Sequence, residues 1–465
     1  MQKKYVIITY LVSGLLFLAL SPVAIFYAKG YRFDLRQKEI KRTGAIEIKT
    51  EPRSAQIYLN NKLLKKTSPL KISNLTPQKY QLKITKPGFM PWESVLEVKP
   101  ELVTLASHII LFPEKAKNND LLTSENLVDF YFSWDEKLLA YNINSGEKIG
   151  FWLLDLNRKI SLRLDQNNFS QILFSGDNSK ILAKSGEDYY IFDLTKLNFF
   201  KRPVLESADV ENFKINLSKQ TKTSLNKIIW HPQDANKLFI QSQTKLFEYN
   251  LASKSLNLLL DKIKTFVEAD QKLYFIREDG ILASNQLVIS LGYLPLGLFN
   301  SLKVISRSLP DANDYQLIVR DDRRLAYLAD NDLYVFESET ADFVLLSDGI
   351  TGAQWSVDLL YYNQREIWIY YLKDRIAKLI TRLASELDQI AWWPMSKYVI
   401  FANLNESTIN FMDVSEILDN FQTFAVYKYQ PPLDKISFDR KGENIWLLNK
   451  NKTNNLVLKE INILP

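Results

Sequence analysis

The residue types that most often carry catalysis or bind metals are scarce in this chain of 465 residues. It has no cysteine and only two histidines, His108 and His231. The lack of cysteine excludes disulfides, thiol nucleophiles, cysteine metal sites and a lipid-modified cysteine. His231 stands in a predicted turn and His108 in a predicted strand, so we expect neither to act as a ligand or general base. We therefore predict no catalytic residue, no metal ligand and no cofactor.

Carboxylates are abundant, with 53 Asp and Glu residues. The sequence lacks the patterns GxSxG, HExxH, GxxxxGK[ST] and GxGxxG, which mark several large classes of enzyme. An enzyme that cleaves envelope glycans with paired carboxylates, as a glycosidase or lyase, is the alternative function. Two acidic clusters resemble fragments of calcium loops but lack the fixed Gly and final Glu, so we predict hairpin turns there. These clusters are Asp311, Asn313 and Asp314, and Asp330, Asn331 and Asp332.

The elements that must position these side chains are short strands in a repeated order. The stretch 132–156 reads as a strand, a polar turn, a second strand, another turn and a third strand. Degenerate copies follow at intervals of roughly 36 to 56 residues, near the period of propeller blades. The spacing predicts a β-propeller of seven or eight blades over residues 120–465, and so an all-β fold.

The copies resemble the blades of Tol-associated and WD-like propellers, whose blade phrase reads WSPDGKxLAY…IWxxDL. The residues that carry this resemblance, with an expected structural role, are Trp134, Asp135, Trp230, Trp355 and Trp392.

The last copy, residues 436–461, supplies three strands, whereas a blade needs four. We predict that part of segment 120–130 pairs with the strand around Leu456–Leu458 and closes the ring, because an unpaired edge invites aggregation. Two stretches interrupt the blade repeat. Residues 197–226 are expected to be a long connection, and residues 286–310 either a packed blade strand with an insert or an exposed apolar patch.

Residues 43–113 alternate apolar and polar side chains and contain regular turn signals, which predicts a small β-sandwich of about six strands. The segment resembles the PEGA family, with Pro52-Arg53-Ser54-Ala55 at the motif that names it. The resemblance implies a module of the cell envelope without catalytic residues. Its motif positions, expected to be structural, are Pro52, Ala55, Tyr58, Pro69, Tyr80, Gly88 and Trp92.

Residues 5–28 contain no charged side chain and are long enough for a membrane-spanning helix. A cleaved signal peptide is the other interpretation, although this apolar run is longer than usual. We predict an anchor in the lipid bilayer, after a tail of residues 1–4 and before a linker of residues 29–42; residues 114–119 form a second linker. The lysines and arginines after the span favour a cytoplasmic domain, but large domains translocate largely regardless of charge. We therefore expect a single-pass protein of the cell membrane with the bulk of the chain outside the cytoplasm.

Residues 1–120 carry 20 Lys and Arg against 9 Asp and Glu. This excess is either ordinary solvated surface or a basic stalk that lies against anionic headgroups or wall polymers. No motif for nucleic-acid binding accompanies it. We predict a non-catalytic binding or scaffolding protein of the cell envelope, whose partner is an envelope protein or a cell-wall polymer.

Overall fold

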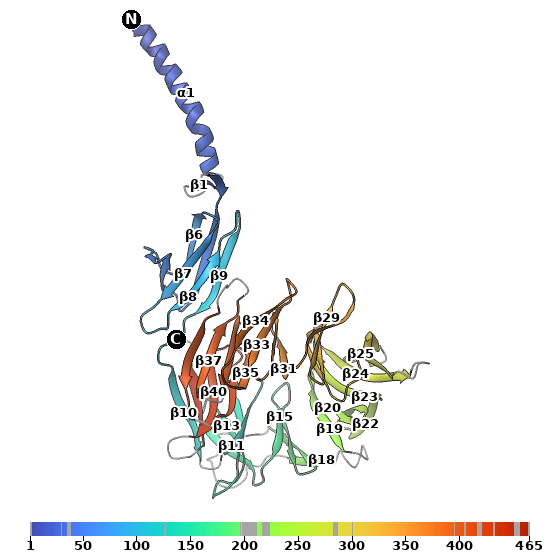
Figure 1. The fold of residues 1–465 in the computed structure, drawn as a ribbon. Helices are drawn as coiled ribbons and strands as arrows, with labels where there is room; N and C mark the ends of the chain where they lie inside the picture. Colours follow the sequence, from blue (N-terminus) through green and yellow to red (C-terminus); the bar gives the residue numbers. More distant parts are fainter. Residues whose placement is uncertain are drawn as a thin grey trace.

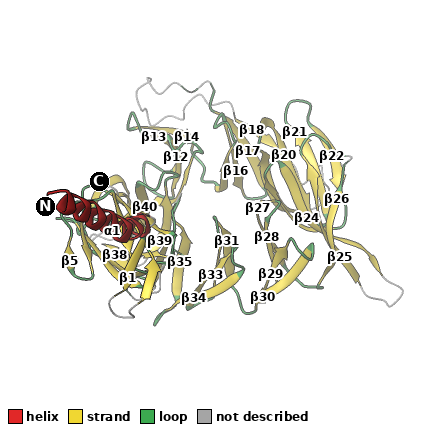
Figure 2. Ribbon diagram, turned by 90° about the horizontal axis from the view of Figure 1, so that it is seen from above, coloured by secondary structure: helices red, strands yellow, loops and turns green. Residues whose placement is uncertain are grey.

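The chain forms a helix, a small sandwich and a ring of sheets, in that order (Figure 1). The computed structural model describes residues 2–463, except residues 29, 35–38, 125–126, 196, 198–211, 216–223, 282–286, 300, 395, 404–405, 416–420, 431–432 and 451–455. The helix projects away from the sandwich, and the sandwich lies against one side of the ring (Figures 1 and 2).

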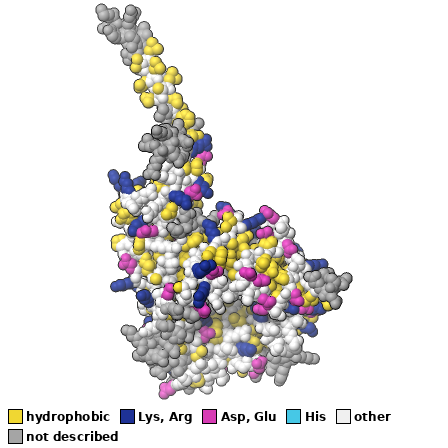
Figure 3. Space-filling view, viewed as in Figure 1, with side chains coloured by type: hydrophobic (Ala, Val, Ile, Leu, Met, Phe, Trp, Pro, Cys, Tyr) yellow, Lys and Arg dark blue, Asp and Glu magenta, His cyan; other side chains and the backbone are white. Residues whose placement is uncertain are grey.

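Helix α1 (Gln2–Ala28) contains the stretch predicted to be a membrane anchor. Large apolar side chains are exposed along its described part, among them Leu15, Phe17 and Leu18 (Figure 3). No helix, taken over its described residues, is long and apolar enough to cross a membrane. The anchor is therefore not confirmed and stays a prediction. A hairpin of β1 (Tyr31–Asp34) and β2 (Glu39–Arg42) follows the helix, within the segment predicted as a linker.

The sandwich consists of a three-stranded and a four-stranded sheet, as its alternating sequence predicts. Ile46, Ile57, Leu82 and Ile84 lie between the sheets with no exposed surface. The first sheet has the order β6-β3-β9, with β3 and β9 parallel, and the second has the order β5-β4-β7-β8. The strands are β3 (Gly44–Glu51), β4 (Gln56–Leu59), β5 (Lys62–Leu63), β6 (Leu70–Leu75), β7 (Lys79–Thr85), β8 (Trp92–Glu97) and β9 (Val103–Ile110).

The rest of the described chain forms eight four-stranded antiparallel sheets, which follow one another around a ring (Figure 2). This is a β-propeller, and eight is the upper of the two predicted blade numbers. Blades 1 to 3 are β11 (Leu127–Phe132), β12 (Leu138–Ile143), β13 (Gly150–Asp155) and β14 (Ile160–Asp165); β15 (Ser170–Phe174), β16 (Lys180–Ser185), β17 (Asp188–Asp193) and β18 (Asn212–Ile215); and β19 (Leu225–His231), β20 (Asp234–Ser242), β21 (Lys245–Asn250) and β22 (Ser255–Leu260).

Blades 4 to 6 are β23 (Ile263–Ala269), β24 (Lys272–Ile281), β25 (Leu287–Pro295) and β26 (Lys303–Leu309); β27 (Tyr315–Asp321), β28 (Arg324–Ala329), β29 (Asp332–Glu337) and β30 (Asp342–Ser347); and β31 (Gly352–Trp355), β32 (Leu359–Tyr362), β33 (Glu366–Tyr371) and β34 (Ile376–Arg382). Blades 7 and 8 are β35 (Leu387–Trp392), β36 (Tyr398–Asn403), β37 (Thr408–Asp413) and β38 (Thr423–Lys428); and β39 (Leu433–Phe438), β40 (Asn444–Lys450), β41 (Leu456–Asn462) and β10 (Lys117–Ser124).

Blade 8 confirms the predicted closure, because its outer strand β10 comes from the other end of the propeller. Leu122 pairs with Leu458, and Ser124 pairs with Leu456. The strand begins at Lys117, within the segment predicted as a linker. Buried apolar clusters join every pair of neighbouring blades, including blade 8 with blade 1, so the ring has no open seam among the described residues.

The predictions for the two stretches that interrupt the repeat have different outcomes. Segment 286–310 forms β25 and β26, and Leu291 and Leu294 are fully buried, so the packed interpretation is confirmed. Within segment 197–226, β18 completes blade 2, whereas residues 198–211 and 216–223 lie outside the described residues.

Candidate functional site: the cleft between the sandwich and the propeller

The sandwich shares one apolar core with blades 7 and 8, so the two domains meet through buried side chains and not through a flexible joint. Phe112, at the end of the sandwich, contacts the rings of Tyr398, Phe411 and Phe424 at centroid distances of 5.5, 4.5 and 5.3 Å. Because aromatic side chains bury large areas, this contact fixes the sandwich on blade 7.

Hydrogen bonds cross the same boundary. The Trp92 indole nitrogen donates to Asp413 Oδ2 at 3.1 Å, and the Ile110 backbone nitrogen donates to the Tyr398 hydroxyl at 3.1 Å. The Gln422 side chain accepts from the Glu93 backbone nitrogen at 2.9 Å and donates to the Pro91 carbonyl at 3.0 Å. Directional bonds within a buried contact fix the relative orientation of the domains as well as their distance.

Asp413 is the buried carboxylate of this boundary. Its Oδ1 accepts from the Ser415 backbone nitrogen at 3.0 Å and from the Ser415 hydroxyl at 2.5 Å, while Oδ2 faces Trp92. Burial raises the pKa of Asp413 despite these donors, because removal from water disfavours the charged form. The residue is part of the domain contact.

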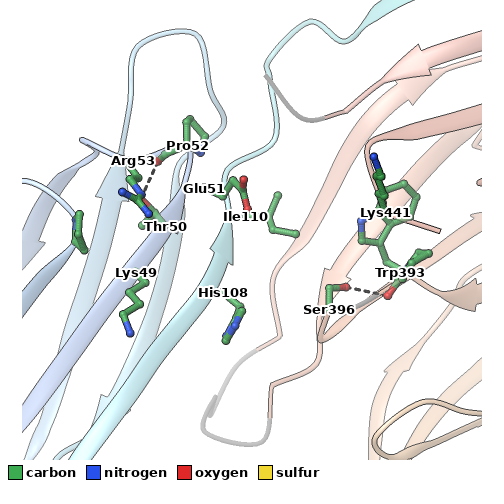
Figure 4. Close-up of a pocket in the computed structure, with 13 residues that line it drawn as sticks. Lys49, Thr50, Glu51, Pro52, Arg53, His108, Ile110, Trp393, Ser396 and Lys441 are labelled. Atoms are coloured by element: carbon green, nitrogen blue, oxygen red, sulfur yellow. Dashed lines mark hydrogen bonds between the residues drawn. The ribbon is translucent and has the colours of Figure 1, made fainter. Parts of the chain in front are cut away.

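Beside this contact, a cleft of about 780 Å³ opens between the two domains (Figure 4). Lys49, Arg53 and His108 line it from the sandwich, and Trp393 and Lys441 line it from the propeller. The propeller side is built from the turns after the first strands of blades 7 and 8, which correspond to the turn at Ser133–Lys137 in blade 1. The remaining lining residues are Thr50, Glu51, Pro52, Pro69, Ile110, Pro394, Ser396 and Gly442.

Local backbone features shape both walls. On the sandwich wall, the pairing of β3 with β9 shifts between Ile48 and Thr50, and His108 has φ of 70°. Such a bulge re-aims the side chains next to it. On the propeller wall, Gly442 has φ of 71°, and a Cβ there would lie 2.6 Å from the Trp393 indole nitrogen. Only glycine lets the blade 8 turn approach Trp393 this closely.

A hydrogen-bond network holds the turn that carries Arg53. The Thr50 hydroxyl donates to the Pro52 carbonyl at 2.8 Å and contacts the Ser68 hydroxyl at 2.5 Å, which in turn accepts from the Ala55 backbone nitrogen at 3.0 Å. Both Thr50 and Ser68 are buried. The sandwich wall is therefore a fixed turn and not a free loop.

A second, more acidic groove lies where blade 8 meets blade 1. Asp135 and Asp439 there accept bonds from their own turns, as in the 2.8 Å contact from the Ser133 hydroxyl to Asp135. Glu136 accepts from the Arg440 backbone nitrogen at 2.6 Å, and burial, with the nearby charge of Asp439, raises its pKa. Among the described residues, no group of three or more His, Asp or Glu could hold a metal ion.

The predicted blade tryptophans lie at blade boundaries. Each donates its indole N–H to a backbone carbonyl of a neighbouring blade: Trp134 to Phe174, Trp230 to Leu173, Trp355 to Ile318 and Trp392 to Gln354, at 2.9–3.1 Å. These four tryptophans do not line the cleft, whereas Trp393, which follows Trp392 in the chain, does. His231 ends β19, is buried, and accepts from the Gln233 backbone nitrogen.

The predicted sandwich residues divide between its core and the cleft. Ala55, Tyr80 and Trp92 are buried, Tyr58 is half-buried, and Gly88 has φ of 81° in a turn. Pro52 and Pro69 line the cleft. The cleft cations Lys49, Arg53 and Lys441 were not predicted. The excess of basic residues before position 120 is a signal for Lys49 and Arg53 only, and it does not locate them.

Residues 43–108 match the sequence profile of the PEGA domain. The chain combines a PEGA domain with a β-propeller. No match was found among curated proteins. A crystal structure of a eukaryotic initiation factor is similar over 84% of this chain and 100% of its own, at 13% identity and a TM-score of 0.50, which establishes the fold alone.

Two further similar structures are an oligogalacturonate lyase in complex with manganese and the Dos1 propeller. The lyase has 14% identity and a TM-score of 0.40 over 75% of this chain and 98% of its own. The Dos1 propeller has 10% identity and a TM-score of 0.48 over 75% and 94%.

Proposed function

We propose that this protein is a non-catalytic binding or scaffolding protein of the cell envelope. Helix α1 anchors it in the membrane, and the PEGA domain holds the propeller outside the cytoplasm. PEGA domains occur in extracellular and envelope proteins. The observation that carries the proposal is the apolar core shared by the PEGA domain with blades 7 and 8. A propeller fixed in this way presents its loops at a constant height and orientation, which suits the binding of a partner that is itself fixed in the envelope.

Capture of partners from cells tests the binding role. The full chain, tagged after Pro465 and extracted in mild detergent, is cross-linked to its neighbours, and the products are identified in wall and membrane fractions. We expect enrichment of an envelope protein or a wall polymer. A second preparation carries Trp92→Ala, which loosens the PEGA domain from the propeller. Enrichment of cytoplasmic proteins alone would contradict the proposal.

The alternative is an enzyme that cleaves envelope glycans, and the acidic groove between blades 8 and 1 is its best location. The raised pKa of Glu136 beside Asp439 is the pattern of a general acid next to a second carboxylate. Incubation of the protein with envelope glycans would then release new reducing ends or unsaturated sugars, and Glu136→Gln would abolish the release. We expect no release from either protein.

A further inference from the structure

The cleft between the PEGA domain and the propeller brings basic side chains of both domains to one opening. Three long cations, Lys49, Arg53 and Lys441, line it against one carboxylate, Glu51. We propose that this cleft binds a phosphodiester-linked polyol or sugar polymer of the envelope. The inference rests on the proposed function and names a ligand class for it.

The cations of the cleft are available to a ligand. All three are exposed, and no ion pair joins Arg53 or Lys441 to another described residue. Lys441 also lines the acidic groove, where its charge opposes the rise in the pKa of Glu136. Lys49 contacts Glu47 at 2.7 Å, but water and salt screen such an exposed pair, so a phosphate can replace this partner. Lys86 adds a cation nearby, since its Nζ donates to the Arg53 carbonyl at 2.7 Å.

The groups around these cations suit phosphate joined to carbon chains. The guanidinium of Arg53 matches two phosphate oxygens at once. His108 Nδ1 contacts the Ser107 hydroxyl at 3.2 Å, which leaves Nε2 to donate one further bond. Pro52, Pro69 and Pro394 add apolar surface to the same cleft. A lining with both charged and apolar groups fits a polymer in which phosphates alternate with CH-rich polyol or sugar units.

The position of the cleft favours a polymer over the headgroups of the anchoring bilayer. Strand β3 runs from the hairpin beside α1 to the cleft, and its eight residues span about 26 Å. The cleft therefore lies a full domain away from the end of the helix. Its volume of about 780 Å³ fits a few repeat units.

Binding of a defined polymer to the full chain tests the proposal. The protein is placed in nanodiscs of zwitterionic lipid and titrated with fluorescent poly(glycerol phosphate), followed by anisotropy. The test variant is Arg53→Gln with Lys441→Gln, one substitution on each wall. The matched control is Arg323→Gln with Lys373→Gln, two exposed cations of blades 5 and 6 that do not line the cleft. We expect the cleft variant to weaken binding by about tenfold or more and the control by less than about twofold.

Several outcomes would overturn the proposal. Equal losses in both variants would indicate attraction by the general charge of the surface, and no loss in either would place the polymer elsewhere. Equal binding of polygalacturonate would show that the cleft does not select phosphate. Polymer binding that is present in nanodiscs of zwitterionic lipid but lost in nanodiscs of anionic phospholipid would assign the cleft to lipid headgroups. If the double variant fails to fold, Arg53→Gln and Lys441→Gln are compared singly, and each must weaken binding.

The same variants separate this proposal from the proposed function. If capture from cells still enriches an envelope partner with Arg53→Gln and Lys441→Gln in place, the protein is a binding protein and the cleft assignment is wrong. If the purified chain binds the polymer through the cleft but captures only cytoplasmic proteins from cells, the cleft chemistry is right and the location is wrong.

Discussion

Trp92 packs within the PEGA domain and also donates a hydrogen bond to Asp413 of the propeller. The resemblance to the PEGA family, whose motif includes a tryptophan at this position, implied a structural residue of the small domain. The partner could not be predicted, because 321 positions separate the two residues and no local pattern links them. The same holds for the cleft cations, whose two walls lie nearly 400 positions apart.

Replacing Trp92 with Phe tests the role of its indole group. The ring packing is largely kept, whereas the buried carboxylate of Asp413 loses one donor. Hydrogen bonds to charged groups contribute about 1.5–3 kcal/mol, so we expect a loss of that size in the free energy of unfolding. The matched control is Trp368→Phe, whose indole donates at 3.3 Å to Glu366, a residue of the same strand. Urea unfolding measures the free energy of unfolding of both variants. An equal loss would show that the bond from Trp92 to Asp413 stabilises the fold no more than the bond from Trp368 to Glu366.

Asp413 should give the stability a distinct dependence on pH. Its pKa in the folded state is raised above the ordinary 3.8, so the protonated form is favoured there. The contribution of Asp413 to the free energy of unfolding is therefore fully present below pH 3.8 and is lost as the pH rises through its pKa in the folded protein. Asp413→Asn cannot titrate. We expect the free energy of unfolding of the wild type, relative to this variant, to fall as the pH is raised above about 4.

Urea unfolding of both proteins at a series of pH values measures this difference. A difference that rises with pH would mean that the donors from Ser415 and Trp92 outweigh burial and lower the pKa instead. A flat difference would mean that Asp413 titrates alike in the folded and unfolded chains.

At the scale of elements, strand pairing between β10 and β41 closes the ring. Seven residue pairs join the two strands, from Lys117 with Asn462 to Ser124 with Leu456. The need for this strand could be predicted because a count of three strands in the final copy leaves an edge without a partner. The blade number could not be narrowed to eight, because the copy around Phe266 and Leu273 is short and, like three other copies, lacks the blade tryptophan.

Removal of β41 should therefore weaken the whole ring and not just its last blade. Truncation after Asn449 leaves β10 without a partner and separates blade 8 from blade 1. A milder form is Leu458→Ala, at a fully buried position that packs in the cluster between these blades. We expect it to cost about 2–5 kcal/mol, as core truncations of leucine do.

The matched control is Leu345→Ala, which lies on the outer strand of blade 5 with 55% of its surface exposed. Its effect should stay within about 0.5 kcal/mol, as at other surface positions. Thermal unfolding compares the four proteins. A truncated chain that unfolds at the temperature of the full one would contradict closure by strand exchange.

The whole molecule combines an exposed apolar helix, a PEGA domain fixed to a ring, and a basic cleft between the two domains. The order of these parts could be predicted from alternation, turn signals and the repeat period. Their relative placement could not, since it depends on contacts of Phe112 and Trp92 with blade 7 that leave no trace in the period of either domain. The proposed function requires that the propeller lies outside the cytoplasm, so membrane topology is the central claim.

Cysteine labelling in intact cells tests the central claim most directly, because the natural chain has no cysteine. One variant carries Arg323→Cys, at an exposed position of blade 5, and a second carries Lys4→Cys, near the start of α1 and before the apolar run of residues 5–28. A membrane-impermeant maleimide is added to intact and to lysed cells, and the membrane fraction is analysed. We predict that the Arg323→Cys protein is labelled equally in both, at full length, and that the Lys4→Cys protein is labelled only after lysis. Labelling of Arg323→Cys only after lysis would place the propeller in the cytoplasm and contradict the account.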